Sequence, residues 1–173
     1  MNEHRTPEEQ QALDAQYMAL ALEEARAAGA AGEVPIGAVV VYEPIDPATR
    51  RPLAPQRVIA RACNLRESTR DPAGHAEFLA MKEAARVLDA WRLTGCTVYV
   101  TLEPCIMCAG LMHQARIDRC VYGASDGKAG ALGTLYAINQ DARLNHVFEA
   151  TPGVLAEECA TMISTFFANK RKK

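Results

Sequence analysis

Apolar residues recur along this chain with two spacings, which separate predicted helices from predicted strands. Helical spacing runs from Thr6 to Gly29, where the capping-box sequence TPEE opens the segment and the glycine is placed to end it. A second amphipathic helix is predicted from His75 to about Ala90, a third over CIMCAGLMHQARI (105–117), and a last one from about Gly153.

Apolar and β-branched runs between these helices predict largely buried strands. They are IGAVVVY (36–42), RVIARAC (57–63), CTVYVT (96–101) and RCVYGA (119–124). The first two are expected to form a hairpin with an enlarged surface loop, because the segment 43–56 between them has four prolines in fourteen residues. The strand, helix and strand from 96 to 124 predict a right-handed parallel crossover. The predicted fold class is therefore α/β, a single three-layer domain on a mixed sheet.

The size and composition of the chain narrow the classes of protein to which it can belong. A length of 173 residues suits one domain, spanning 1–173, with a substantial core. No apolar run reaches the roughly 18 residues of a membrane span, so no membrane association is expected. The polar, acidic start resembles neither a secretory signal nor a transit peptide, and a cytoplasmic location is expected. The net charge of −2 argues against a uniformly basic nucleic-acid-binding surface but leaves a local basic patch open.

The six cysteines fall into two groups. Four lie in apolar or strand-like surroundings and are expected to pack in the core as reduced thiols: Cys63, Cys96, Cys120 and Cys159. Cys105 and Cys108 follow Pro104 at a helix start, which places both sulfurs on one face of the first turn. A helix N-terminus favours thiolates, which bind metals. A redox dithiol has the same spacing but typically occurs in a thioredoxin-like context.

His75 is a third candidate ligand, because it also opens a helix that follows a strand of the same sheet. Such helix starts gather beyond the carboxyl ends of parallel strands, where ligands bind. One histidine and two cysteines fit zinc, and three protein ligands with a fourth position left to water are typical of catalytic zinc. The sequence therefore predicts one Zn²⁺ per chain at His75, Cys105 and Cys108.

The other histidines do not supply an evident fourth ligand. His4 lies in an expected N-terminal tail. His113 is eight residues beyond Cys105 on the same predicted helix, roughly 12 Å along its axis and too far to share the ion. His146, in a distant loop, stays open as an alternative.

Glu77 is the candidate proton carrier of this site. It follows His75 by two residues, so the two side chains converge only on a site beyond the helix end. A carboxylate there can accept a proton from zinc-bound water and deliver protons to a ring nitrogen and a departing amine. An acidic residue in a first helical turn is also common for stability alone. However, HAE followed by PCIMC matches the known H-x-E and P-C-x-x-C signature of the zinc nucleobase deaminases.

Beyond this signature, the chain resembles the bacterial tRNA adenosine deaminases, which convert the wobble adenosine of a tRNA anticodon to inosine. The resemblance covers nearly all of the chain from about residue 13. The segments that carry it are GEVPIGAVVV, DPAGHAEFLAM, TVYVTLEPCIMCAG, YGASDGKAGALGT, LNHVFEATPGVLAEECA and STFFANKRKK. The GEVPIGAV block, with HAE and TLEPCxMCAG, separates it from most cytidine deaminases.

The resemblance implies a fold, an assembly and a set of substrate contacts. The fold is the three-layer α/β/α cytidine deaminase-like domain with a five-stranded mixed sheet, usually a homodimer, and the partner is the tRNA anticodon stem-loop. Glu77 would be the general acid and base, with zinc held by His75, Cys105 and Cys108. The implied substrate-binding positions are Asn64 and the backbone of Ala76 at the base, Asp126, Lys128 and Asn145 around the RNA-side pocket, and Phe166 and Phe167 near the anticodon.

Several of these positions also have simpler explanations. Asp126 precedes a glycine in a natural turn sequence, Asn145 can cap a helix, and the Phe166–Phe167 pair can anchor the last helix in the core. Two features depart from the family pattern: Gly74 replaces a common alanine, and the loop 43–56 is longer than usual. Its Arg50 and Arg51 can extend an RNA surface or be solvated, and the basic tail 170–173 can contact phosphates or fray.

Two other functions use the same residues. A deaminase of free nucleosides or bases, of guanine or cytosine type, needs the same ligands but has less reason for the terminal phenylalanines and basic cluster. A non-catalytic, zinc-stabilised RNA-binding protein belongs to another class. The intact Glu77 and the open fourth position argue against this last alternative.

Overall fold

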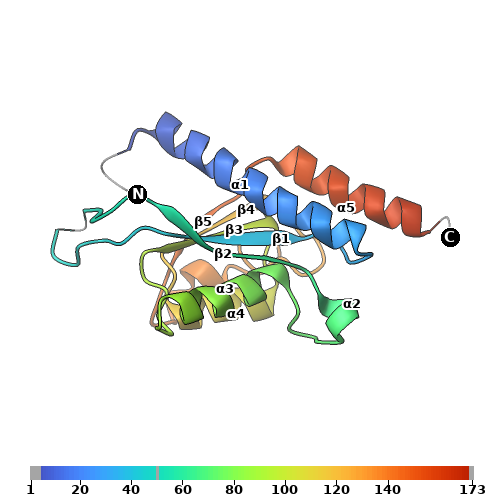
Figure 1. Cartoon of the computed structure of the whole chain (residues 1–173). Coiled ribbons are helices and arrows are strands. Elements are labelled where there is room, and N and C mark those ends of the chain that lie inside the picture. Colours follow the sequence, from blue (N-terminus) through green and yellow to red (C-terminus); the bar gives the residue numbers. More distant parts are fainter. Residues whose placement is uncertain (1–4, 50, 172–173) are drawn as a thin grey trace.

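The centre of the molecule is a five-stranded sheet with the strand order β2-β1-β3-β4-β5 (Figure 1). The computed structural model describes residues 5–49 and 51–171, so His4, Arg50, Lys172 and Lys173 lie outside the described residues. The strands are β1 (Gly37–Tyr42), β2 (Arg57–Cys63), β3 (Cys96–Leu102), β4 (Arg119–Ala124) and β5 (Glu149–Thr151). The first four match the predicted strands to within one residue at each end.

The direction of the strands decides which of their ends meet. β1 is antiparallel to both of its neighbours, β2 and β3, whereas β3, β4 and β5 run parallel. β2 therefore runs in the same direction as β3, although β1 lies between them. The ends of β2, β3 and β4 consequently lie at one edge of the sheet, the carboxyl edge. The predicted mixed sheet, the β1–β2 hairpin and the parallel β3–β4 connection are confirmed.

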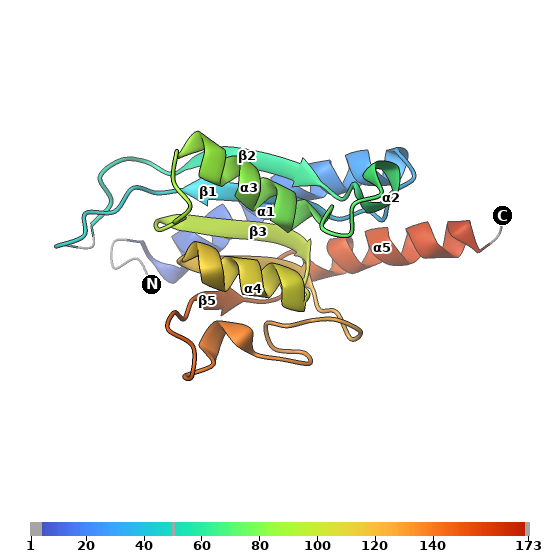
Figure 2. The same ribbon diagram turned by 90° about the horizontal axis from the view of Figure 1, so that it is seen from below.

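Helices cover both faces of this sheet, as Figures 1 and 2 show, and the three-layer α/β/α prediction is confirmed. α1 and α5 lie on one face, and α3 and α4 on the other. Val39 and Val41 of β1 belong to the apolar cluster under α1, whereas Ala38 and Val40 belong to the cluster under α3 and α4. Within residues 5–49 and 51–171, no helix is both long and apolar enough to cross a membrane. The helices are α1 (Pro7–Ala30), α2 (Arg66–Thr69), α3 (Ala76–Val87), α4 (Ile106–Ala115) and α5 (Ala156–Lys170).

Three short elements were not predicted from the residues: α2, β5 and the 3₁₀ turn η1 (Ile138–Gln140). Each has three or four residues, too few to show a hydrophobic period. β5 is defined by its pairing with β4, a contact distant in sequence. α1 has the predicted capping box and continues one residue past Gly29. α3 ends at Val87 and α5 begins at Ala156, each three residues inside the predicted limits.

The proline-rich loop 43–56 joins the end of β1 to the start of β2 and therefore lies at the edge opposite the carboxyl edge (Figure 1). Asp46 orders part of it, since its Oδ1 accepts the N–H groups of Ala48 and Thr49 at 2.9 and 2.7 Å. Arg51, considered above as an RNA contact, is exposed in this loop, which lies at the edge opposite the starts of α3 and α4.

α1 lies directly against the start of β1. A Cβ atom at Gly37 would overlap the carbonyl oxygen of Ala21 and the amide nitrogen of Ala25, both in the backbone of α1. Glycine is therefore required at this point, because any side chain would push helix and strand apart.

A buried ion pair connects α1 to the strands β3, β4 and β5 on the face of the sheet that α1 covers. The guanidinium of Arg119 at the start of β4 donates to both oxygens of Asp14 on α1, at 2.8 and 2.7 Å. The hydroxyl of Tyr99 on β3 also donates to Asp14 at 2.9 Å, and Arg119 donates to Thr151 on β5 at 2.7 Å. The pair is shielded from water, since the side chain of Asp14 is 4% exposed and that of Arg119 is 15% exposed. The network therefore joins α1, β3, β4 and β5.

We expect Asp14→Ala to lower the free energy of unfolding by about 3 kcal/mol, because it leaves the Arg119 guanidinium buried without its partner. Glu23→Ala on the same helix is the matched control. Glu23 pairs with Arg61 at the surface, where an ion pair contributes less than about 1 kcal/mol. Urea unfolding followed by circular dichroism measures both, and equal losses would contradict the role given to the buried pair.

Candidate active site

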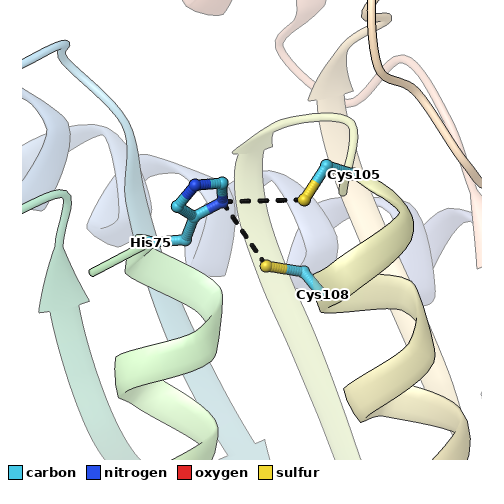
Figure 3. A group of neighbouring side chains, drawn as sticks. All are labelled: His75, Cys105 and Cys108. Atoms are coloured by element: carbon cyan, nitrogen blue, oxygen red, sulfur yellow. Dashed lines mark hydrogen bonds between the residues drawn. The ribbon is translucent and has the colours of Figure 1, made fainter. Parts of the chain in front are cut away.

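Three side chains from two helix starts meet at the carboxyl edge: His75, Cys105 and Cys108 (Figure 3). His75 is the N-cap residue of α3, Cys105 is the N-cap residue of α4, and Cys108 lies in the first turn of α4. The Nδ1 atom of His75 is 3.7 Å from the Sγ of Cys105 and 3.6 Å from the Sγ of Cys108. The structure thus brings together the three residues predicted as ligands.

The turn before α3 sets the position of the histidine. Asp71 accepts the N–H of Ala73 on its side chain at 2.8 Å and the N–H of Gly74 on its carbonyl at 2.9 Å. The carbonyl of Gly74 in turn accepts the N–H of Leu65, which follows β2 closely in the chain, at 2.9 Å. The DPAG turn is therefore fastened to the end of β2 and delivers His75 to the carboxyl edge.

The geometry of the three donor atoms fits a zinc ion. Tetrahedral zinc with bonds of about 2.0 to 2.3 Å needs donors roughly 3.3 to 3.8 Å apart. The two nitrogen–sulfur distances of 3.7 and 3.6 Å fall in this range, and all three atoms lie within 4.8 Å of one another. Among the described residues, no other His, Cys, Asp or Glu joins the group. The nitrogen and sulfur donor set suits zinc better than magnesium or calcium.

His113 and His146 are engaged elsewhere. The Nδ1 of His113 donates to the carbonyl of His146 at 3.1 Å, and the Nε2 of His146 donates to the carbonyl of Ile117 at 2.9 Å. Both rings therefore lie near the end of α4 that is remote from Cys105. This arrangement answers the question left open by the sequence, because His146 is not part of the donor group.

The two thiols of the group differ in proton affinity. Contact with Cys108, assisted by His75, lowers the pKa of Cys105 to about 3. The same contact, together with burial, raises the pKa of Cys108. Contact with Cys105 also raises the pKa of the His75 imidazole. Cys105 therefore loses its proton more readily than Cys108, and the thiolate is the form that binds metals.

Glu77 lies in the first turn of α3, where its side chain is buried beside this group. The residue is 4% exposed. Burial raises the pKa of its carboxyl, while contacts with Cys108 and His75 act in the opposite direction. A buried carboxyl with a raised pKa can both accept and return a proton near neutral pH.

Asn64 and Ala76 border the same edge. Ala76 is buried next to His75, and Asn64 directly follows β2. The Nδ2 of Asn64 donates to Glu33 at 3.3 Å and to the carbonyl of Val34 at 3.4 Å. These bonds fix the orientation of the Asn64 amide.

Two buried carboxylates of the site region were missed from the sequence: Glu33, 1% exposed, and Glu103, 2% exposed. Glu33 accepts the N–H of Ser68 at 2.6 Å as well as the Asn64 amide, and so fastens α2 to the end of β2. Burial opposes ionisation of Glu103, but hydrogen bonds from Thr134 and from backbone N–H groups hold the pKa of its carboxyl below its usual value. The sequence signal for both was a glutamate inside an otherwise apolar segment. Such a glutamate is rarely buried unless it is paired, so its position indicates a buried hydrogen-bond network.

The predicted RNA-side residues separate into two places. Lys128 lines a hollow together with Phe167, Lys170 and Arg171, and Phe166 contacts Phe167 edge-on at 5.4 Å between ring centroids. Phe167 is 43% exposed, so it does not serve as a core anchor. Asp126 precedes Lys128 in the loop after β4 and accepts its N–H at 2.8 Å.

Asn145 lies apart from these residues. Its Oδ1 accepts Nη1 of Arg116 at 2.9 Å. Arg116 caps the end of α4, and a ten-residue helix is about 15 Å long. The structure therefore does not bring Asn145 to the donor group of its own chain.

Comparison with known proteins agrees with this geometry. The family model described as cytidine and deoxycytidylate deaminase zinc-binding region matches residues 11–124. The tRNA-specific adenosine deaminase of Bacillus subtilis (strain 168) is 47% identical over 160 residues, 92% of each chain. The tRNA-specific adenosine deaminase of Haemophilus influenzae is 44% identical over 161 residues, 93% of this chain and 87% of that protein.

Two solved structures extend the comparison. One, from a study of A-to-I editing by tRNA:A34 deaminases at the wobble position, superposes with a TM-score of 0.73 at 39% identity, covering 85% of this chain and 98% of that one. A guanine deaminase from Bacillus subtilis reaches a TM-score of 0.52 at 32% identity, covering 64% and 63% of the two chains. The expected cytidine deaminase-like fold is thereby confirmed.

We expect Cys105→Ser to lower zinc affinity by at least about 100-fold, since loss of a direct ligand should exceed the 10- to 100-fold effect of losing an outer partner. Cys63→Ser, at the end of β2 and outside the donor group, is the matched thiol control and should retain one zinc per chain. Metal analysis and chelator competition on the purified proteins measure both. Full zinc retention in Cys105→Ser would refute the assignment of this ligand.

Proposed function

The chain belongs to the cytidine and deoxycytidylate deaminase zinc-binding family, and we propose that it deaminates adenosine to inosine at the wobble position of tRNA anticodons. The observation that carries the proposal is the meeting of His75, Cys105 and Cys108 beside the buried Glu77. The substrate is supported by identities of 47% and 44% to tRNA-specific adenosine deaminases over more than nine-tenths of the chain. We also propose that the chain acts as a single domain in the cytoplasm, as a homodimer.

His75, Cys105 and Cys108 would hold the zinc ion. When bound there, zinc lowers the pKa of water to about 7 and so supplies the nucleophile for hydrolysis. Glu77 moves the protons. Its carboxylate would accept a first proton from the water that attacks C6 of adenine and pass it to the ring nitrogen N1. It would then take the second proton from the new C6 hydroxyl and give it to the amino group, which leaves as ammonia while the C6 carbonyl of inosine forms.

The base and its RNA would be held by separate groups of residues. Asn64, fixed by its bond to Glu33, and the backbone of Ala76 would contact the base. Lys128, Lys170 and Arg171 would face phosphates, and Phe167 offers an exposed ring on which a base can stack. An unpaired anticodon loop suits this surface, because a base outside a duplex enters the pocket at a lower unstacking cost.

Asp126, Phe166 and Asn145 complete the proposed RNA contacts. Asp126 and Phe166 adjoin Lys128 and Phe167 respectively. Asn145 lies about one helix length from the donor group, so it would serve the site of a second copy more readily than its own. This placement is compatible with the proposed homodimer.

A panel of substrates tests the proposal. We expect inosine to form in anticodon stem-loops that carry a wobble adenosine, and little ammonia from free adenosine, cytidine or guanine. Free guanine belongs in the panel because a guanine deaminase shares this fold at 32% identity. If ammonia forms from free bases and no stem-loop contains inosine, the proposal is wrong and the protein is a nucleobase deaminase.

We expect Glu77→Ala to reduce inosine formation by at least about 100-fold while zinc stays at one ion per chain, because a positioned proton carrier contributes roughly 10²–10⁴-fold. Glu83→Ala is the matched control on the same helix, where Glu83 pairs with Arg86 at the surface. It should leave the rate unchanged. Unimpaired turnover by Glu77→Ala would exclude this carboxylate as the proton carrier.

A further inference from the structure

The loop that follows β4 is built around one buried carboxylate. Glu103 lies between the end of β3 and the zinc ligand Cys105, and it accepts four hydrogen bonds from this loop. Its Oε2 accepts the N–H of Asp126 at 3.0 Å and the hydroxyl of Thr134. Its Oε1 accepts the N–H groups of Leu132 and Thr134, each at 3.1 Å. The two ends of the segment 126–134 are thus held at a single point.

The middle of the same loop is attached to the zinc-ligand segment. The N–H of Ala131 donates to the carbonyl of Pro104 at 2.9 Å, and Gly130 forms an isolated β-bridge with Cys105. A Cβ atom at Gly130 would overlap the Glu103 carboxylate, so glycine permits the close approach. The loop and the start of α4 therefore share one rigid framework.

This framework sets the position of Lys128. Asp126, held by Glu103, accepts the N–H of Lys128 at 2.8 Å. Lys128 is exposed at the outer side of the loop and faces the hollow that Phe167, Lys170 and Arg171 also line. The distance between this cationic surface and the donor group at Cys105 consequently depends on Glu103.

We propose that Glu103 is a positioning residue for the nucleic-acid substrate, which holds Lys128 where it meets a phosphate while the base occupies the zinc site. The inference rests on the proposed function, since it assumes an RNA substrate. Glu103 contacts neither RNA nor metal and acts through the loop 126–134. Its role is to keep Lys128, which would bind the backbone of the substrate, at a fixed distance from the catalytic centre.

The hydrogen-bond chemistry explains why a carboxylate is needed. Each oxygen of Glu103 receives two donors, so both oxygens must act only as acceptors. A glutamine has nearly the same shape but carries an NH₂ group on one side. That group would face two donors, and one end of the loop would be released.

The test measures RNA affinity and its salt dependence in zinc-loaded protein that carries Glu77→Ala to prevent turnover. A labelled anticodon stem-loop is titrated at several salt concentrations with Glu103→Gln, Lys128→Ala and the double variant. We expect each single substitution to weaken binding roughly tenfold, as for one charged hydrogen bond, and to reduce the slope of log affinity against log salt by about 0.7. The double variant should bind no more weakly than the weaker single variant, because both changes remove one contact.

Asp14→Asn is the matched control, since it also alters a buried carboxylate that accepts several hydrogen bonds but lies in α1, away from the loop. It should lower stability and leave the salt slope unchanged. Thr134→Val removes only the hydroxyl donor and should give a smaller change of the same kind if Glu103→Gln folds poorly. An unchanged salt slope in Glu103→Gln and Thr134→Val, or additive effects of Glu103→Gln and Lys128→Ala, would overturn the inference.

The same titration separates this inference from the proposed function. Absence of stem-loop binding by the parent protein would remove the RNA substrate itself. Binding by the parent with a normal salt slope in the Glu103 variant would leave the RNA substrate in place and exclude the positioning role.

Discussion

The single antiparallel strand β1 is the constraint on which the rest of the structure depends. Because β1 lies between β2 and β3 and is antiparallel to both, β2 and β3 end at the same edge of the sheet. The chain leaves β3 through a short connection into α4, and it leaves β2 through α2 and the DPAG turn into α3. The starts of α3 and α4 bring a histidine and two cysteines together. If β1 ran against only one of its two neighbours, β2 and β3 would end at opposite edges and the starts of α3 and α4 would not meet. Metal binding is thus a consequence of strand direction as much as of ligand chemistry.

Buried carboxylates connect segments that apolar packing alone would leave free to slide. Asp14 joins α1 to β3 and β4, Glu33 joins α2 and Asn64 to the chain before β1, and Glu103 closes the loop after β4. Each is nearly excluded from water, and each accepts several hydrogen bonds that offset the cost of burying its charge. Because a partly satisfied carboxylate in such surroundings is costly, these contacts favour one arrangement of the backbone segments that they join.

The sequence predicted those parts of the molecule that are encoded locally. The capping box of α1, four of the five strands and the HAE and PCIMC segments all have signals within a few residues. What it did not predict depends on partners far along the chain. The strand β5 exists through its pairing with β4, and the roles of Glu33 and Glu103 depend on donors about 30 residues away. The distance of Asn145 from the donor group likewise follows from its bond to Arg116, 29 residues earlier.

The proline-rich loop 43–56 lies at the edge of the sheet opposite the carboxyl edge, unlike the loops that carry the site residues. It emerges where β1 ends and β2 begins, so the length of the sheet separates it from the group of His75, Cys105 and Cys108. Lengthening a loop whose ends are already paired adds little to the entropy of closing it. Insertions here should therefore leave the reaction unchanged, and the position is a natural point at which to attach a dye, an affinity tag or a second protein domain.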